Sequence, residues 1–215
     1  MLELSFHPLS SFCQKVLIAL YENDTPFTPH FIDLGKETDA AALAKRWPLR
    51  KFPVLHDHAR DGTVPESTII IEYLTQHHPG PTRLVPDDPD AARETRFRDR
   101  FYDLHVQVPL QKIVGDRLRP ADQKDPYGVA QAATALRAAY DLVESDMAGK
   151  TWAMGDAFTM ADCAAAPSLS YAAMVVPFDD THPAAAAYLR RLRERPSYAR
   201  TLREAEPYLH LFPKA

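Results

Sequence analysis

The first residues of the chain alternate between apolar and polar side chains, and a helical pattern follows. Residues 2–6, Leu-Glu-Leu-Ser-Phe, have the period of a half-buried strand, which His7-Pro8 ends. Ser10 and Ser11 are favourable N-cap residues, and the apolar residues within 16–20 supply one helical face. The pattern therefore predicts a strand followed directly by a helix.

The next segments repeat this order. Residues 27–34 resemble a strand, but Pro29 removes a backbone donor, so we expect this strand at an edge of the sheet. Residues 38–47 form an alanine-rich stretch that Pro48 closes, which predicts a second helix.

A hairpin and a third helix complete this part of the chain. Asp61-Gly62 separates two short apolar runs, residues 52–56 and 63–65, and this dipeptide is a hairpin signal. Glu66-Ser67 then precedes an apolar helical face. The predicted order of strand, helix, strand, helix, strand, strand, helix is that of a thioredoxin-like α/β domain.

A proline-rich segment divides the chain. Residues 79–90 contain four prolines and no apolar periodicity, so we interpret them as a linker. The expected domains are residues 1–78, thioredoxin-like, and residues 91–215, with no predicted strand and several helical stripes. The fold class is thus α/β followed by all-α.

Two features of the helical part stand out. Pro109 interrupts the stripe formed by Phe97, Phe101, Leu104 and Val108, which predicts a kink. Thr159-Met-Ala-Asp162 has the spacing of a capping box with Asp in place of Glu, and it predicts the start of another helix.

Composition narrows the possible functions. The 215 residues carry 25 Lys and Arg against 29 Asp and Glu, a net charge of −4, which is unfavourable for nucleic-acid binding. We find neither a signal peptide nor an apolar run of the ~20 residues that spans a bilayer, so we expect a cytoplasmic protein without membrane or nucleic-acid partners. The two cysteines are expected to be reduced thiols.

Three segments could carry chemistry. Ser10-Ser11-Phe12-Cys13 lies at a helix N-terminus, where backbone N–H groups favour an anion, although helix capping alone would also explain the serines. Lys51-Phe52-Pro53 precedes a strand, and a cis proline there would leave the backbone of Phe52 free to pair with an extended peptide; the trans isomer is commoner. Glu66 and Ser67 could bind an amino acid's ammonium and carboxylate, or simply cap a helix.

These segments, with one more, resemble the soluble glutathione transferases of bacterial type with a serine-type active site. The four matching segments lie in order over essentially the whole chain: HPLSSFCQKV at 7–16, FPVL at 52–55, ESTIIIEYL at 66–74 and GDAFTMAD at 155–162. The resemblance implies a cytoplasmic homodimer that acts in detoxification and transfers alkyl or aryl groups other than methyl. It implies glutathione as co-substrate, a hydrophobic electrophile as second substrate, and no permanently bound cofactor.

The resemblance also implies roles for individual residues. Ser10, with Ser11 as the alternative, would stabilise the glutathione thiolate. Phe52, before Pro53, would pair with the cysteinyl unit, Lys51 would lie near the glycyl end, and Glu66 with Ser67 would hold the γ-glutamyl group. Thr159 and Asp162 would form a buried folding element and take no part in catalysis.

The second substrate would lie against the first helices of the second domain. The helical spacing of Tyr102, His105 and Pro109, together with Val106, predicts one wall of its site, with Tyr171 as a weaker candidate. The same residues could instead belong to the core stripe.

Two other functions remain open from the sequence. Ser-x-x-Cys could make Cys13 the redox centre of a glutathione-dependent thiol-disulfide reductase, and the fold could serve as a non-catalytic interaction module. His56, His58, His77 and His78 could suggest a metal, but no further ligand is fixed by spacing, so we expect no metal site.

Overall fold

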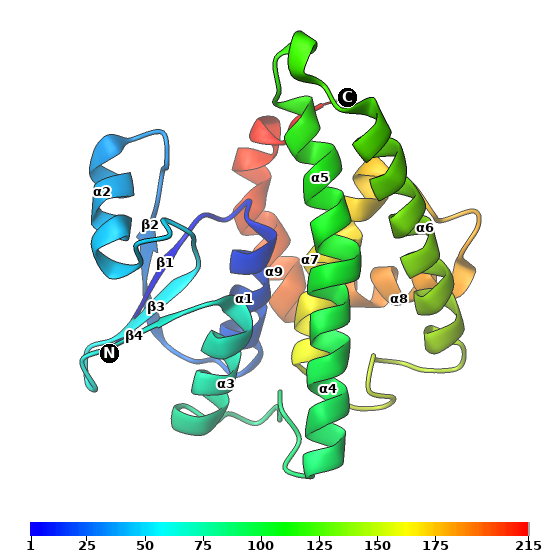
Figure 1. Cartoon of the computed structure of the whole chain (residues 1–215). Coiled ribbons are helices and arrows are strands. Elements are labelled where there is room, and N and C mark those ends of the chain that lie inside the picture. The colour runs from blue at the N-terminus through cyan, green and yellow to red at the C-terminus, as the bar shows by residue number, and fades with distance from the viewer. Residues whose placement is uncertain (215) are drawn as a thin grey trace.

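The computed structural model describes residues 1–214 and contains a four-stranded sheet followed by a bundle of helices (Figure 1). The elements of the first part are β1 (Leu2–Phe6), α1 (Ser11–Glu22), β2 (Phe27–Phe31), α2 (Glu37–Arg46), β3 (Val54–Asp57), β4 (Gly62–Pro65) and α3 (Ser67–His77). The elements of the second part are α4 (Pro89–Phe101), the π-helical η1 (Tyr102–Gln107), α5 (Val108–Arg117), η2 (Ala121–Gln123), α6 (Pro126–Met147), α7 (Met160–Val175), α8 (Pro183–Glu194), α9 (Pro196–Ala205) and η3 (Glu206–Leu211). The predicted α/β thioredoxin-like domain followed by an all-α domain is confirmed.

The sheet has the strand order β2-β1-β3-β4. β2 pairs parallel with β1, while β3 pairs antiparallel with both β1 and β4. Pro29 therefore lies in an edge strand, where its missing N–H breaks no ladder, as predicted. Asp61 adopts a φ of 47° in the tight β3–β4 turn, which agrees with the hairpin signal.

Helices cover both faces of the sheet. Buried side chains of α1 and α3 pack on one face with Leu4 and Leu55, while Leu43 of α2 packs on the other with Ile32 and Val54. Figure 1 shows α1 and α3 between the sheet and the helical part. Ile18 and Ala19 of α1 join the core of that part, so the two domains share apolar contacts.

The helix α7 is the buried centre of the second domain. It begins at a capping box in which the backbone N–H of Thr159 donates to Asp162 Oδ2 at 2.8 Å. Asp162 Oδ1 also accepts hydrogen bonds from the amide of Ala153 at 2.8 Å and from the hydroxyl of Tyr188 at 2.6 Å. The box thus ties the start of α7 to the preceding loop and to α8.

The helices α4 and α5 are joined by a short π-helical segment. Pro109, where the sequence predicts a kink, lies in the first turn of α5, directly after η1, a π-helical segment that links α4 to α5. Proline lacks a backbone donor and its ring crowds the carbonyl four residues earlier, and π-helical turns commonly accompany such interruptions. The consequence is a change of phase between the side chains of α4 and those of α5.

Candidate active site

Three loops meet where the strands end. Ser5 of β1 lies opposite Val54 of β3, and Val54 lies opposite Pro65 of β4. The chain that follows β1, the chain that precedes β3 and the chain that follows β4 therefore leave the sheet at the same edge. This brings together three segments that are far apart in the sequence.

Ser10 caps the N-terminus of α1. The amide of Cys13 donates to Ser10 Oγ at 3.4 Å, and the amide of Ser10 donates to the carbonyl of His7 at 3.0 Å. Because Ser10 Oγ acts as an acceptor here, its hydroxyl proton remains free to be donated to another group. Ser11, the first residue of the helix, is buried, whereas Ser10 is half-buried.

The segment before β3 contains a cis peptide bond between Phe52 and Pro53. Lys51 is exposed, and the ring of Phe52 stacks with that of His7 at a centroid distance of 6.3 Å. His7 also contacts Tyr208 of η3 at 5.2 Å, so the aromatic contact reaches the C-terminal segment. Partial burial lowers the pKa of His7 despite the opposing charge of Asp33, and the amide of Leu9 donates to its Nδ1. Its place in the strand-ending His-Pro pair did not indicate these contacts.

Glu66 occupies a strained position before α3. Its φ of 70° lies in the left-handed region, which is rare for residues other than glycine and clusters at ligand-binding sites. The side chain of Glu66 is exposed, while Ser67 is buried at the first position of the helix. The structure thus presents a carboxylate and a helix N-terminus side by side.

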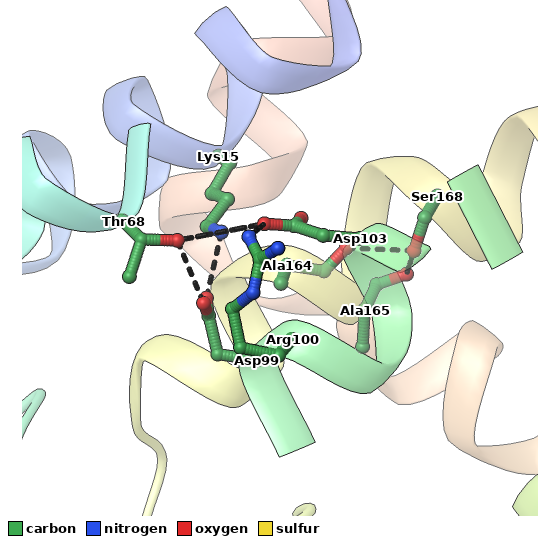
Figure 2. A network of polar contacts seen from close by, with 8 residues as sticks. All are labelled: Lys15, Thr68, Asp99, Arg100, Asp103, Ala164, Ala165 and Ser168. Atoms are coloured by element: carbon green, nitrogen blue, oxygen red, sulfur yellow. Dashed lines mark hydrogen bonds and ion pairs between the residues drawn. The ribbon is translucent and has the colours of Figure 1, made fainter. Parts of the chain in front are cut away.

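A buried polar network lies directly behind this segment (Figure 2). Lys15 Nζ lies 2.7 Å from Asp99 Oδ1 and 2.9 Å from Asp103 Oδ2, and it donates to Thr68 Oγ1 at 2.9 Å. Thr68 in turn donates to Asp99 Oδ2 at 2.7 Å. Lys15 belongs to α1, Thr68 to α3, and the two carboxylates to α4 and η1. The network therefore fixes the residue next to Ser67 relative to the helical domain.

The charge balance of this network depends on Lys15. Lys15 is 1% exposed and Asp99 is fully buried, so water screens their attraction little. Burial, together with the nearby charge of Asp103, raises the pKa of Asp99 against the opposing effect of Lys15. The sequence did not indicate this network, because a single lysine within an apolar helix is not a recognisable pattern. The spacing of Asp99 and Asp103, one helical turn apart, was the signal that could have indicated it.

A cleft of about 290 Å³ opens beside Ser10 and Ser11, between the two domains. Its wall on η1 and α5 contains Gln107, Leu110, Gln111, Val114 and Leu118, and its other side is formed by Leu9, Tyr171 and the C-terminal residues 211–213. Tyr171, the weaker sequence candidate, thus lines the cleft. Its hydroxyl donates to the carbonyl of Leu9 at 2.9 Å.

The expected wall of Tyr102, His105, Val106 and Pro109 is not the wall of this cleft. Tyr102 and Val106 are buried in the helical core, His105 is exposed beside Phe101, and Pro109 is half-buried. Tyr102 and Val106 thus belong to the core stripe, the alternative that the sequence left open, while Gln107, Leu110 and Gln111 line the cleft.

Cys13 is unsuited to the redox role that the sequence left open. Its side chain is fully buried in the core between the sheet and α1. Burial raises the pKa of the Cys13 thiol to about 12, although hydrogen bonds with Ser10 and His7 oppose the rise. A thiol that is neutral at physiological pH and shielded from solvent is a poor nucleophile for disulfide exchange.

The histidines around β3 and at the end of α3 make aromatic and polar contacts. Within residues 1–214, no group of three or more His, Cys, Asp or Glu side chains is arranged to hold a metal ion. His56 and His58 contact each other edge to face, while His78 lies 3.2 Å from Asp57. Across the same residues, no helix has the length and apolar character that crossing a membrane requires.

Comparisons with known proteins agree on one family. The chain matches the models for the glutathione S-transferase N-terminal domain at residues 4–82 and for the C-terminal domain at residues 126–191. It is 31% identical to the glutathione S-transferase-like protein LUC7 of a Fusarium species over 60% of this chain and 58% of that protein. It is 27% identical to glutathione S-transferase U25 of Arabidopsis thaliana over 98% of this chain and 92% of that protein.

A solved structure extends the comparison to three dimensions. The glutathione S-transferase of Methylobacterium radiotolerans, in complex with glutathione sulfonate, superposes with a TM-score of 0.79 at 28% identity. The match covers 93% of each chain.

Proposed function

This chain belongs to the glutathione S-transferase family, and from that premise we propose that it binds glutathione, stabilises its thiolate and transfers it to an electrophilic small molecule. The observation that carries the proposal is the cross-strand row of Ser5, Val54 and Pro65, which gathers the Ser10, Phe52 and Glu66 segments at one edge of the sheet. These segments hold complementary groups for the parts of a γ-glutamyl tripeptide.

Each of the three segments would bind a different part of glutathione. The backbone of Phe52 would pair with the cysteinyl unit as a short added strand, and Lys51 would attract the glycyl carboxylate. The carboxylate of Glu66 would accept hydrogen bonds from the γ-glutamyl ammonium, while Ser67 and the α3 amides would receive the γ-glutamyl carboxylate. The Lys15 network would hold α3, and so Ser67, in position for this contact.

The groups at the start of α1 would stabilise the glutathione thiolate. A free thiol has a pKa near ~8.5, and each unit by which the pKa is lowered corresponds to about 1.4 kcal/mol of preference for the thiolate. The Ser10 hydroxyl would donate to the sulfur, and the α1 N-terminus would add its favourable dipole. The thiol proton would leave to solvent, and the sulfur would form a bond to an electrophilic carbon. In an addition the anionic adduct would take a proton from solvent, and in a displacement the leaving group would depart with the bonding electron pair.

The electrophile would occupy the cleft beside Ser10. Leu110, Val114 and Tyr171 would contact its apolar part, while Gln107 and Gln111 would offer polar groups. This cleft joins the Ser10 segment to the helical domain, so a bound electrophile would lie within reach of the sulfur.

Replacing Ser10 by alanine tests the role of its hydroxyl. We expect turnover of glutathione with an electrophile such as 1-chloro-2,4-dinitrobenzene to fall about tenfold or more, because a loss of one pKa unit of thiolate stabilisation alone is worth about 1.4 kcal/mol. Glutathione affinity, measured by calorimetry, should change little. Ser11→Ala is the matched control; an unchanged rate for Ser10→Ala with a loss for Ser11→Ala would move the role to Ser11.

We also propose that two chains associate, the first domain of one against the second domain of the other. Exposed apolar side chains on α3, α4 and α6 support this interface, with Ile69 53%, Phe97 62% and Leu142 60% exposed. Sedimentation equilibrium should give about twice the chain mass of 24.2 kDa. Phe97→Glu should shift the equilibrium to the monomer, and Tyr127→Glu, at another exposed aromatic residue, should not. A monomeric unmodified protein would contradict the proposal.

A further inference from the structure

The backbone just before β3 has an unpaired edge. The N–H and C=O groups of Lys51 and Phe52 have no hydrogen-bond partner within residues 1–214. The N–H of Arg50, by contrast, donates to the carbonyl of Trp47 at 2.9 Å and so closes the turn that contains Pro48. An extended peptide can therefore pair with residues 51 and 52 as a short added strand, and this pairing ends at Arg50.

The sheet register sets the direction of such a peptide. β3 and β4 pair antiparallel, and their register continued by one residue places Pro53 beside Glu66. In the proposed function the γ-glutamyl unit lies at Glu66 and the cysteinyl unit at Phe52. The third residue of the peptide then comes to Lys51, and it is the last residue that the free backbone edge can pair.

The segment that carries this edge is strongly basic. Residues 45–51 contain four cationic side chains and no acidic one. Arg46 forms an ion pair with Glu3. The other three cationic side chains are exposed and form no ion pair within the described residues: Lys45, Arg50 and Lys51. The single carboxylate of a glycyl unit would leave most of this positive charge without a partner.

Arg50 has a backbone conformation that favours glycine. Its φ of 54° lies in the left-handed region, where a residue other than glycine costs about 1–3 kcal/mol. The turn uses only the backbone of Arg50, so its fold does not need the guanidinium. Strain of this kind is common at ligand-binding sites, and here it places an exposed cation next to Lys51.

We propose that Arg50 and Lys51 select thiol peptides of the γ-glutamyl-cysteinyl type whose third residue is acidic, an inference that rests on the proposed function. Lys51 would attract the α-carboxylate of that residue. Arg50 would attract its side-chain carboxylate, which a glycyl unit lacks, and a guanidinium can hold a carboxylate through two N–H groups at once. The two cations thus match the two carboxylates of an acidic third residue.

The test is calorimetric titration with γ-glutamyl-cysteinyl-glutamate and γ-glutamyl-cysteinyl-glutamine, which differ by one charge at nearly the same shape. We expect the glutamate peptide to bind about threefold or more tightly at an ionic strength of about 20 mM. The ratio should fall below about 1.5 at ~0.5 M salt, because salt screens exposed charges.

Variants assign the preference to Arg50. Arg50→Gly should remove it, and since glycine suits a φ of 54°, the thermal unfolding temperature should not fall. Arg50→Lys, which keeps the charge, should retain part of the preference. Arg60→Gln is the matched control, because Arg60 is an exposed arginine in the β3–β4 turn, and it should leave the ratio unchanged.

Titration with glutathione separates the two proposals. Equal affinities of the two peptides, a preference that persists in Arg50→Gly, or one that is also lost in Arg60→Gln would overturn this inference and leave the proposed function intact. Failure of glutathione and of both peptides to bind would overturn both.

Discussion

Replacing Lys15 by methionine is expected to lower the free energy of unfolding by about 3–5 kcal/mol. Methionine keeps much of the side-chain volume but removes the ammonium that lies 2.7 Å from Asp99 and 2.9 Å from Asp103. Two carboxylates would then share a buried site with only the more distant Arg100, 3.6 Å from Asp103, for compensation. Urea unfolding near neutral pH would measure the loss.

The pH dependence separates charge from packing. Without Lys15, the pKa of Asp99, already raised by burial, should rise further, so one carboxyl would bind a proton in the folded state. A raised folded-state pKa gives stability that is present at low pH and is lost as the pH rises through that value. The destabilisation by Lys15→Met should therefore be smaller near pH 4 than near pH 8.

A matched control is available at the surface. Lys112 forms an ion pair with Asp125, and both side chains are about one-third exposed. Lys112→Met should cost less than about 1 kcal/mol, because solvent screens such pairs. Equal effects of the two substitutions would show that the buried network does not need its cation.

Asp162→Ala should also remove several kcal/mol of stability, about 3–5 kcal/mol. The substitution leaves the amides of Ala153 and Thr159 and the hydroxyl of Tyr188 without their buried acceptor. Denaturant unfolding followed by circular dichroism would measure the effect. Asp156→Ala, in the exposed loop before the capping box, should change stability by less than about 0.5 kcal/mol. A small effect of Asp162→Ala would contradict the folding role of the box.

Local patterns predicted much of the fold. Pro29 indicated an edge strand because a missing N–H is tolerated only there, and Asp61-Gly62 indicated the hairpin because its turn needs a positive φ. Thr159 and Asp162 indicated the start of α7 because the capping contacts are local in sequence. Each of these signals depends on a few neighbouring residues.

The sequence could indicate only those parts of the candidate site that lie close to the ends of strands. Ser10, Phe52 and Glu66 lie next to strand termini, so the sheet register brings their segments together. The wall of the cleft could not be predicted in the same way, because the helical spacing of Tyr102 and Val106 fits a core stripe as well as a cleft wall, and tertiary packing decides between the two. The Lys15 network joins residues of four different elements, and its pairing is decided by tertiary packing.

The most direct test of the proposed function is a spectroscopic titration of the purified protein with glutathione near neutral pH. The ultraviolet absorbance of the bound thiolate would be followed, with S-methylglutathione, which cannot ionise at sulfur, as the control. We expect a saturable thiolate signal and a pKa for bound glutathione below that of the free thiol. Saturable binding without a thiolate signal, or no saturable binding, would contradict the claim that this site activates glutathione.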